Sequence, residues 1–231
     1  MTCSPTFSES KNRMPASHFF RRWWHGLAML VTAGLLGGCT IPASVHPLSD
    51  NKTSKVDTRL IGRWVAFEED EETEPGETRE KTIANQDLYT VGLRKSSSNT
   101  MKLIYVELDD DGEVTVKKSI FFTTSIDKQH YLSWQSKEEK KIVYVIAAYD
   151  LDANSVLTVW VMDNNKIVKA IEQGRVDGEI KITVNEKDGK KVESKTAHLT
   201  AKPELLRRFL HETGLDCFDK EHPMKYQFLG R

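Results

Sequence analysis

The chain of 231 residues has little of what several protein classes require. Three cysteines are too few for a disulfide-stabilised scaffold, and 13 glycines with 7 prolines exclude a fibrous or low-complexity chain. Lys plus Arg is 33 and Asp plus Glu is 34, so the basic excess typical of nucleic-acid-binding proteins is missing. The remaining class, with 39% hydrophobic and 29% charged residues, is a globular domain with a polar surface.

The apolar run at residues 27–36 is too short to cross a bilayer, which takes about 20 residues. Two arginines precede it and small residues follow it, as in a secretory signal peptide. Its end, Leu36-Gly37-Gly38-Cys39, resembles the bacterial lipobox. The resemblance implies cleavage before Cys39 and attachment of lipid, including an acyl chain such as palmitate, at that cysteine. A plain secreted protein and a transmembrane anchor are the alternatives.

These features predict where the protein is located and how the chain is divided. Residues 1–38 are a removed signal, with the start at Met1 or Met14. Thr40 stands where an Asp tends to retain such lipoproteins at the inner membrane, so we expect an outer-membrane anchor facing the periplasm. Residues 39–58 are polar, carry two prolines and have no period, which predicts a flexible tether. Residues 59–231 form a single domain.

Short segments rich in β-branched and aromatic residues predict antiparallel strands through most of this domain. They are separated by turn signals such as Asp109-Asp110-Asp111-Gly112. The expected strands that come before the first helix cover residues 87–94, 100–108, 114–123, 129–135, 141–149 and 155–162. Regular spacing of strands every 8–12 residues is typical of a sandwich or a closed barrel. The dense acidic run at residues 68–80 predicts an exposed loop.

Two short helices are predicted in the C-terminal third of the chain. Asp163 is a candidate N-cap for the first, and Gly174 a candidate end. The second covers about residues 203–212, with Pro203 in its first turn and an apolar face. Strands at residues 180–185, 191–199 and 224–229 complete the predicted pattern, so the fold is mainly β.

The start of the domain, Leu60-Ile61-Gly62-Arg63-Trp64, resembles the Gly-x-Trp opening of the lipocalins and the wider calycin family. The resemblance implies an antiparallel calycin β-barrel in which this Trp closes one end. The segment from His46 through Trp64 also resembles a set of uncharacterised bacterial lipoproteins with a lipocalin-like barrel. That set has no assigned chemistry.

Aromatic residues on the predicted strands are candidates for the lining of a barrel interior, because alternate residues of a strand face inwards. Such a barrel either holds one small apolar ligand or is filled by its own side chains. The candidates for ligand lining or barrel core are Trp64, Tyr105, Trp134, Tyr144 and Trp160.

No catalytic or cofactor signature is found in the sequence. Glu107, Asp109, Asp111 and Gly112 fit the start of a calcium loop, but Lys118 stands where the final carboxylate belongs. The histidines show no zinc-type spacing, and neither a Gly-x-Ser-x-Gly elbow nor a phosphate-binding loop occurs. We therefore expect no cofactor, no metal and no enzymatic activity.

Two functions remain open at this stage. The first is a lipid-anchored envelope protein whose barrel binds a hydrophobic small molecule or lipid. The second is a non-catalytic envelope interaction or assembly module with a packed barrel, which binds another envelope protein through an exposed face. The pattern does not distinguish them.

Overall fold

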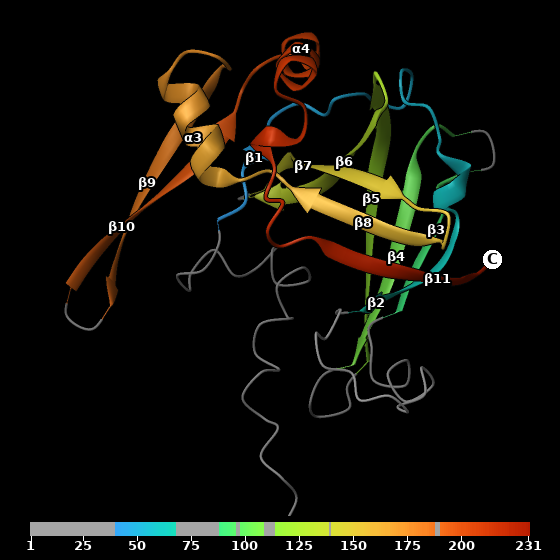
Figure 1. Cartoon of the computed structure of the whole chain (residues 1–231). Helices are drawn as coiled ribbons and strands as arrows, with labels where there is room; N and C mark the ends of the chain where they lie inside the picture. The colour runs from blue at the N-terminus through green and yellow to red at the C-terminus, as the bar shows by residue number, and fades with distance from the viewer. Residues whose placement is uncertain (1–39, 68–87, 96–97, 109–113, 139, 188–189) are drawn as a thin grey trace, which may run out of the picture. The chain divides into compact units, whose positions relative to one another are not determined.

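Eight antiparallel strands close into a barrel in the computed structural model, which describes residues 40–67, 88–95, 98–108, 114–138, 140–187 and 190–231 (Figure 1). The strands pair in the order β2-β3-β4-β5-β6-β7-β8-β11, and β11 pairs back onto β2. Their bounds are β2 Gly62–Phe67, β3 Leu88–Leu93, β4 Met101–Leu108, β5 Val114–Ile126, β6 Gln129–Glu138, β7 Lys141–Leu151, β8 Val156–Val161 and β11 Met224–Gly230.

The predicted mainly β barrel with two C-terminal helices is confirmed, and the predicted strands differ from the observed ones only near their ends. Residues in the hairpin turns explain where these strands end. Asp127, Lys140 and Ser155 adopt positive φ in the hairpin turns. The signal peptide, Cys39, the acidic run and the Asp109–Gly112 loop lie outside the described residues.

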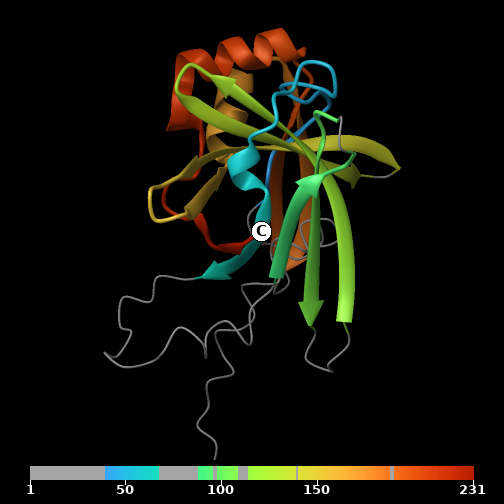
Figure 2. The same cartoon turned by 90° about the vertical axis from the view of Figure 1, so that its right-hand side faces the viewer.

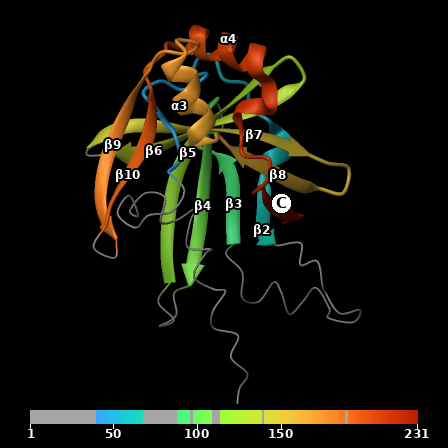
Figure 3. The same cartoon turned by 60° about the vertical axis from the view of Figure 1, so that its left-hand side comes forward.

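An insertion between β8 and β11 forms a second layer outside the barrel. It contains α3 Asn164–Glu172, β9 Gly178–Lys187, β10 Lys190–Leu199, α4 Pro203–Thr213 and the 3₁₀ turn η3 Gly214–Cys217. Asp163 caps α3 as predicted, since its carboxylate accepts hydrogen bonds from the amides of Asn165 and Lys166. Figures 2 and 3 show α4 lying across one end of the barrel strands and α3 beside the β9–β10 hairpin.

The outer face of the barrel and the two helices share one apolar core. Tyr131 on β6 and Ile146 on β7 pack with Ile167 of α3, Leu206 of α4 and the fully buried Phe218. Strand β7 is therefore apolar on both faces, because one face meets the helices and the other meets the barrel interior.

The prediction of a flexible tether at residues 39–58 is wrong for the part that the structure describes. Strand β1, Ala43–Ser44, pairs with β7 on one side and β10 on the other. Leu48 is 0% exposed and its amide donates to Ser133 Oγ at 2.9 Å. The hydroxyl of Ser54 donates to the Thr123 carbonyl at 2.9 Å. Packed segments usually show a periodic pattern of apolar residues. This segment does not, because hydrogen bonds between serine hydroxyls and backbone groups help to hold it against the strands.

Candidate functional site

The register of the strands divides the barrel side chains into an inner and an outer set, because partners across a ladder share a face. Tyr131, opposite Ala148, belongs to the outer set since both pack in the core with the helices. The alternate residues Trp134, opposite Phe121, and Ala147 therefore point inwards.

Several side chains of the inner set are aromatic and contact one another. Trp64 contacts Phe228 with ring centroids 5.0 Å apart. Tyr89 stacks on Tyr105 at 5.8 Å and meets the edge of Tyr226 at 5.2 Å. The first contact joins β2 to β11, and the other two join β3 to β4 and to β11, so the rings form two aromatic clusters inside the barrel.

One end of the barrel is closed by the turn before β2. This turn is the 3₁₀ helix η2, Thr58–Leu60, and the indole Nε1 of Trp64 donates to the Leu60 carbonyl at 2.9 Å. Trp64 is 2% exposed and lies beside this turn. Gly62 is required here, because a Cβ on it would lie 2.3 Å from the Phe228 ring.

A polar network fastens this closed end. The hydroxyl of Tyr149 donates to Asp57 Oδ2 at 2.9 Å, and Arg59 Nη2 contacts the same oxygen at 2.6 Å. Burial acts to raise the pKa of Asp57, but the hydrogen bonds from Arg59 and Tyr149 outweigh it and the pKa lies below its usual value. Burial, with the Asp57 charge nearby, raises the pKa of Tyr149 strongly. The network holds both groups in one protonation state near neutral pH.

At the opposite end of the barrel, which we call the mouth, β4 ends and β5 begins. Here Lys117 points inwards with its Nζ 5.5 Å from the centre of the Tyr105 ring. The indole of Trp134 donates to Ser119 Oγ, next along the inner face of β5. The mouth therefore combines aromatic faces with an ammonium group and a hydroxyl.

The structure separates the five predicted lining residues into two groups. Trp64, Tyr105 and Trp134 belong to the inner set. Tyr144 and Trp160 alternate with it and lie on the outer side, where Trp160 packs against the core that the helices cover. The prediction that these two line the interior is corrected, because strands apolar on both faces give no periodic signal. Sequence reasoning missed Asp57 and Lys117.

The outside of the barrel carries an exposed apolar area near the mouth, which we call the outer-wall patch. It runs across β3, β4 and β5, where Leu88 lies opposite Val106 and Val106 lies opposite Val116. Val116 is 53% exposed and Val114, next along the same face, is 58% exposed. Ile104 completes the patch on the same face of β4.

Groups that carry metal or nucleophilic chemistry are few among the described residues. No cluster of three or more His, Cys, Asp or Glu side chains that could hold a metal ion occurs in these ranges. Cys217 is buried, and burial raises the pKa of its thiol to about 11. No described helix has the length and apolar character to span a membrane.

No family model, curated protein or solved structure matches the chain. The fold is therefore established from strand order and register alone. An eight-stranded antiparallel barrel closed at one end by a 3₁₀ turn and a buried Trp is consistent with a calycin-like barrel.

Proposed function

We propose that this protein is a non-catalytic binding module, anchored in a bacterial envelope, that takes a hydrophobic small molecule or lipid at the barrel mouth. The observation that supports it is the inner wall at that end, where Lys117 lies over the Tyr105 ring and the inward-facing Trp134 is half-buried. Ligand sites of this kind are mostly apolar with a few polar groups that fix orientation.

Burial along the barrel gives the direction of entry. At the closed end Trp64, Met101 and Tyr149 are at most 2% exposed, so that half of the interior is filled by side chains. At the mouth Lys117, Ser119 and Trp134 are only half-buried. A ligand enters from the mouth, lies against Tyr105 and Trp134, and does not reach Trp64.

Quenching of tryptophan fluorescence by a brominated fatty acid tests this site. Trp134 faces inwards and Trp160 outwards, so Trp134→Phe and Trp160→Phe are a matched pair. Saturable quenching should remain in Trp160→Phe and fall by more than half in Trp134→Phe. Native mass spectrometry of the chain purified from its own host should show a bound apolar molecule. Equal quenching in both variants, together with an empty native mass, contradicts a ligand at the mouth.

The anchor is the second part of the proposal. Lipid on Cys39 would be followed by only Thr40, Ile41 and Pro42 before β1 begins at Ala43. Four residue steps span at most about 14 Å, so the fold stays next to the membrane surface. Cys39→Ser should abolish incorporation of labelled palmitate and release the protein from the outer-membrane fraction. Unchanged labelling in this variant contradicts the anchor.

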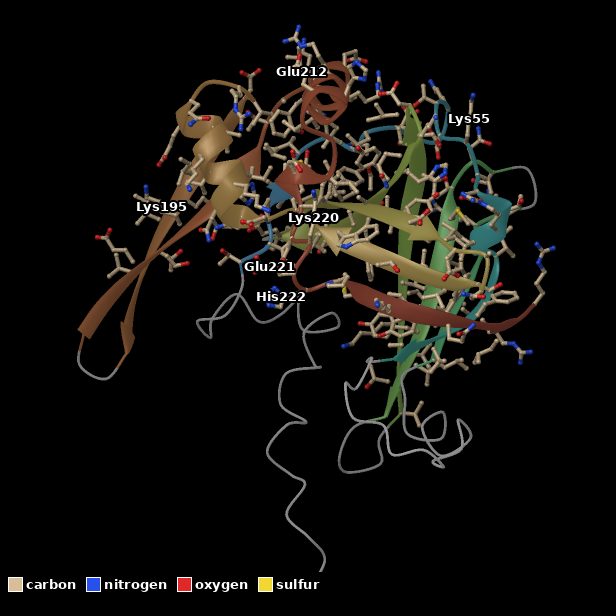
Figure 4. The ribbon with its side chains drawn as sticks, viewed as in Figure 1. Lys55, Lys195, Glu212, Lys220, Glu221 and His222 are labelled. Carbon is tan, nitrogen blue, oxygen red and sulfur yellow. The ribbon has the colours of Figure 1, made fainter. Side chains whose placement is uncertain are left out.

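The outer-wall patch favours a second candidate function, binding of another envelope protein. Apolar side chains this exposed and contiguous on a barrel wall mark interaction surfaces. A photo-crosslinking residue in place of Val116 should capture one partner in intact cells. The same residue in place of Glu212 on α4 (Figure 4) should capture none. Equal capture from both positions contradicts a specific partner on the patch.

A further inference from the structure

Strand β9 has an edge that no described strand covers. It stands at the end of the sheet order, where its one strand partner is β10. The eight barrel strands pair on both edges, because the barrel is closed. An uncovered strand presents a row of N–H and C=O groups that template the addition of another strand.

The side chain of Asn164 shows which backbone groups face that edge. It donates to the Lys195 carbonyl at 2.7 Å and accepts from the Ala197 amide at 2.9 Å, on the edge of β10 away from β9. Lys195 lies opposite Ile182. Because the Lys195 carbonyl points away from β9, these two residues form a non-hydrogen-bonded pair, and the backbone groups of Ile182 also point away from β10. By alternation, those of Ile180 and Val184 point the same way.

The same three residues form an apolar row on one face of β9. Ile180 packs against the core next to α3, whereas Ile182 is 60% exposed and Val184 is 53% exposed. Opposite Ile182, the ammonium of Lys195 pairs with Glu172 of α3 at 2.9 Å (Figure 4). Figure 3 shows the β9–β10 hairpin extending beyond α3. Apolar side chains and open backbone groups therefore coincide on the protruding part.

We propose that β9 pairs with β9 of a second copy of this chain, antiparallel and with the two-fold axis at Ile182. In this register Ile180 lies opposite Val184 of the other copy, and Ile182 lies opposite Ile182. Each of these pairs exchanges two N–H···O bonds through the groups that face the open edge. Lys181 lies opposite Thr183, so no like charges meet between residues 180 and 184. A two-fold axis at Lys181 would place two lysines opposite each other.

The occupant is a second copy because β9 is complementary to itself at this point. Ile180, Ile182 and Val184 give the same apolar pattern in either direction along the strand. A two-fold axis uses the open edge of β9 in both copies, so association ends at a dimer and does not extend into a fibre. Strand addition over five residues buries little surface, which places the dimer among weak interfaces below about 1,200 Å². We expect reversible association in the micromolar range. The inference is independent of any ligand at the barrel mouth.

Disulfide trapping in the full chain tests the register. Across a hydrogen-bonded antiparallel pair the Cα atoms are about 5.5 Å apart, within the range that a disulfide spans. Ile182→Cys should therefore give a covalent dimer on mild oxidation. In Val184→Cys the two introduced cysteines lie four residues apart along the strand, about 13 Å, and should not crosslink. Both variants keep the three native cysteines, so crosslinks through those appear equally in both.

Sedimentation of the full chain over about 1–100 µM gives a second readout. The unmodified chain should show a concentration-dependent dimer, and Ile182→Pro should be monomeric. This proline removes an N–H that β10 does not use, so the hairpin is retained. The thermal midpoint checks that this variant folds. A monomer at 100 µM, crosslinking of Val184→Cys as fast as Ile182→Cys, or a dimer that persists in folded Ile182→Pro overturns the proposal.

Discussion

Truncation of Leu48 to alanine should destabilise the fold by about 3 kcal/mol, the middle of the usual range for a buried leucine. Leu48 is 0% exposed and packs in the core with Tyr131, Ile146 and Phe218. Its backbone is held on both sides, by Ser133 Oγ at its amide and by Arg207 Nη1 at its carbonyl, 2.6 Å away. The segment therefore cannot collapse fully into the cavity that the truncation leaves.

Equilibrium unfolding in urea measures this effect. With a denaturant slope of about 2 kcal/mol per molar, the midpoint should fall by about 1.5 M. Val45→Ala is the matched control, because Val45 is in the same segment but 43% exposed, and it should change stability by less than about 0.5 kcal/mol. Equal effects of the two substitutions, or a loss below about 1 kcal/mol for Leu48→Ala, would refute the packing of residues 43–57 on the barrel.

Three further outcomes follow from the closed end of the barrel and from the buried thiol. Tyr149→Phe removes a donor to the Asp57 carboxylate and should cost about 1.5 kcal/mol in urea unfolding. The folded-state pKa of Asp57 lies below its usual 3.8, so Asp57 adds stability above that value and loses it as pH falls through the folded pKa. The gap in unfolding free energy between the unmodified chain and Asp57→Asn should shrink below about pH 4. The thiol of Cys217 has its pKa raised to about 11, so a disulfide reagent at pH 8 should modify it at least about tenfold faster in urea, with Cys217→Ser as the blank.

Much of the barrel could be predicted from the sequence because each strand carries its own local signal. Runs of β-branched and aromatic residues ended at turn residues, and Asp163 supplied a helix cap that the structure confirms. The position of Trp64 was expected from the resemblance of Gly62-Arg63-Trp64 to the calycin Gly-x-Trp opening. These signals are local, so they needed no knowledge of what packs on the strands.

The inward or outward direction of aromatic side chains could not be predicted on strands β7 and β8. A strand with one face in solvent alternates polar and apolar residues. On β7, however, Tyr144, Val145 and Ile146 are consecutive and apolar. The helices that cover the outer face come later in the chain, so nothing local distinguishes Tyr144 from Tyr105. Of the five candidates, the register places Trp64, Tyr105 and Trp134 on the inner face of the barrel, and Tyr144 and Trp160 on the outer face.

The segment before the barrel was misjudged for a different reason. Its packing depends on hydroxyl and amide groups that bond to distant strand backbone, as Ser54 does with Thr123. Such bonds have no sequence period, and they join residues 69 positions apart. The sequence pattern of a polar segment with prolines is therefore the same whether the segment is a free linker or packs across a sheet.

The insertion between β8 and β11 explains why one chain combines a closed barrel wall with an open sheet edge. In the closed barrel each of the eight strands pairs on both edges. A further strand can therefore join only where two neighbouring barrel strands stop pairing with each other. That place is β7, where β8 pairs with residues 147–151 and β1 takes the same edge at Tyr144 and Val145. β10 then adds to β1, and β9 adds to β10. Because the Ile182 side chain is 60% exposed, Ile182→Lys should weaken association with a stability change within about 0.5 kcal/mol. A large loss of stability in this variant would instead show that the row of β9 packs within its own chain.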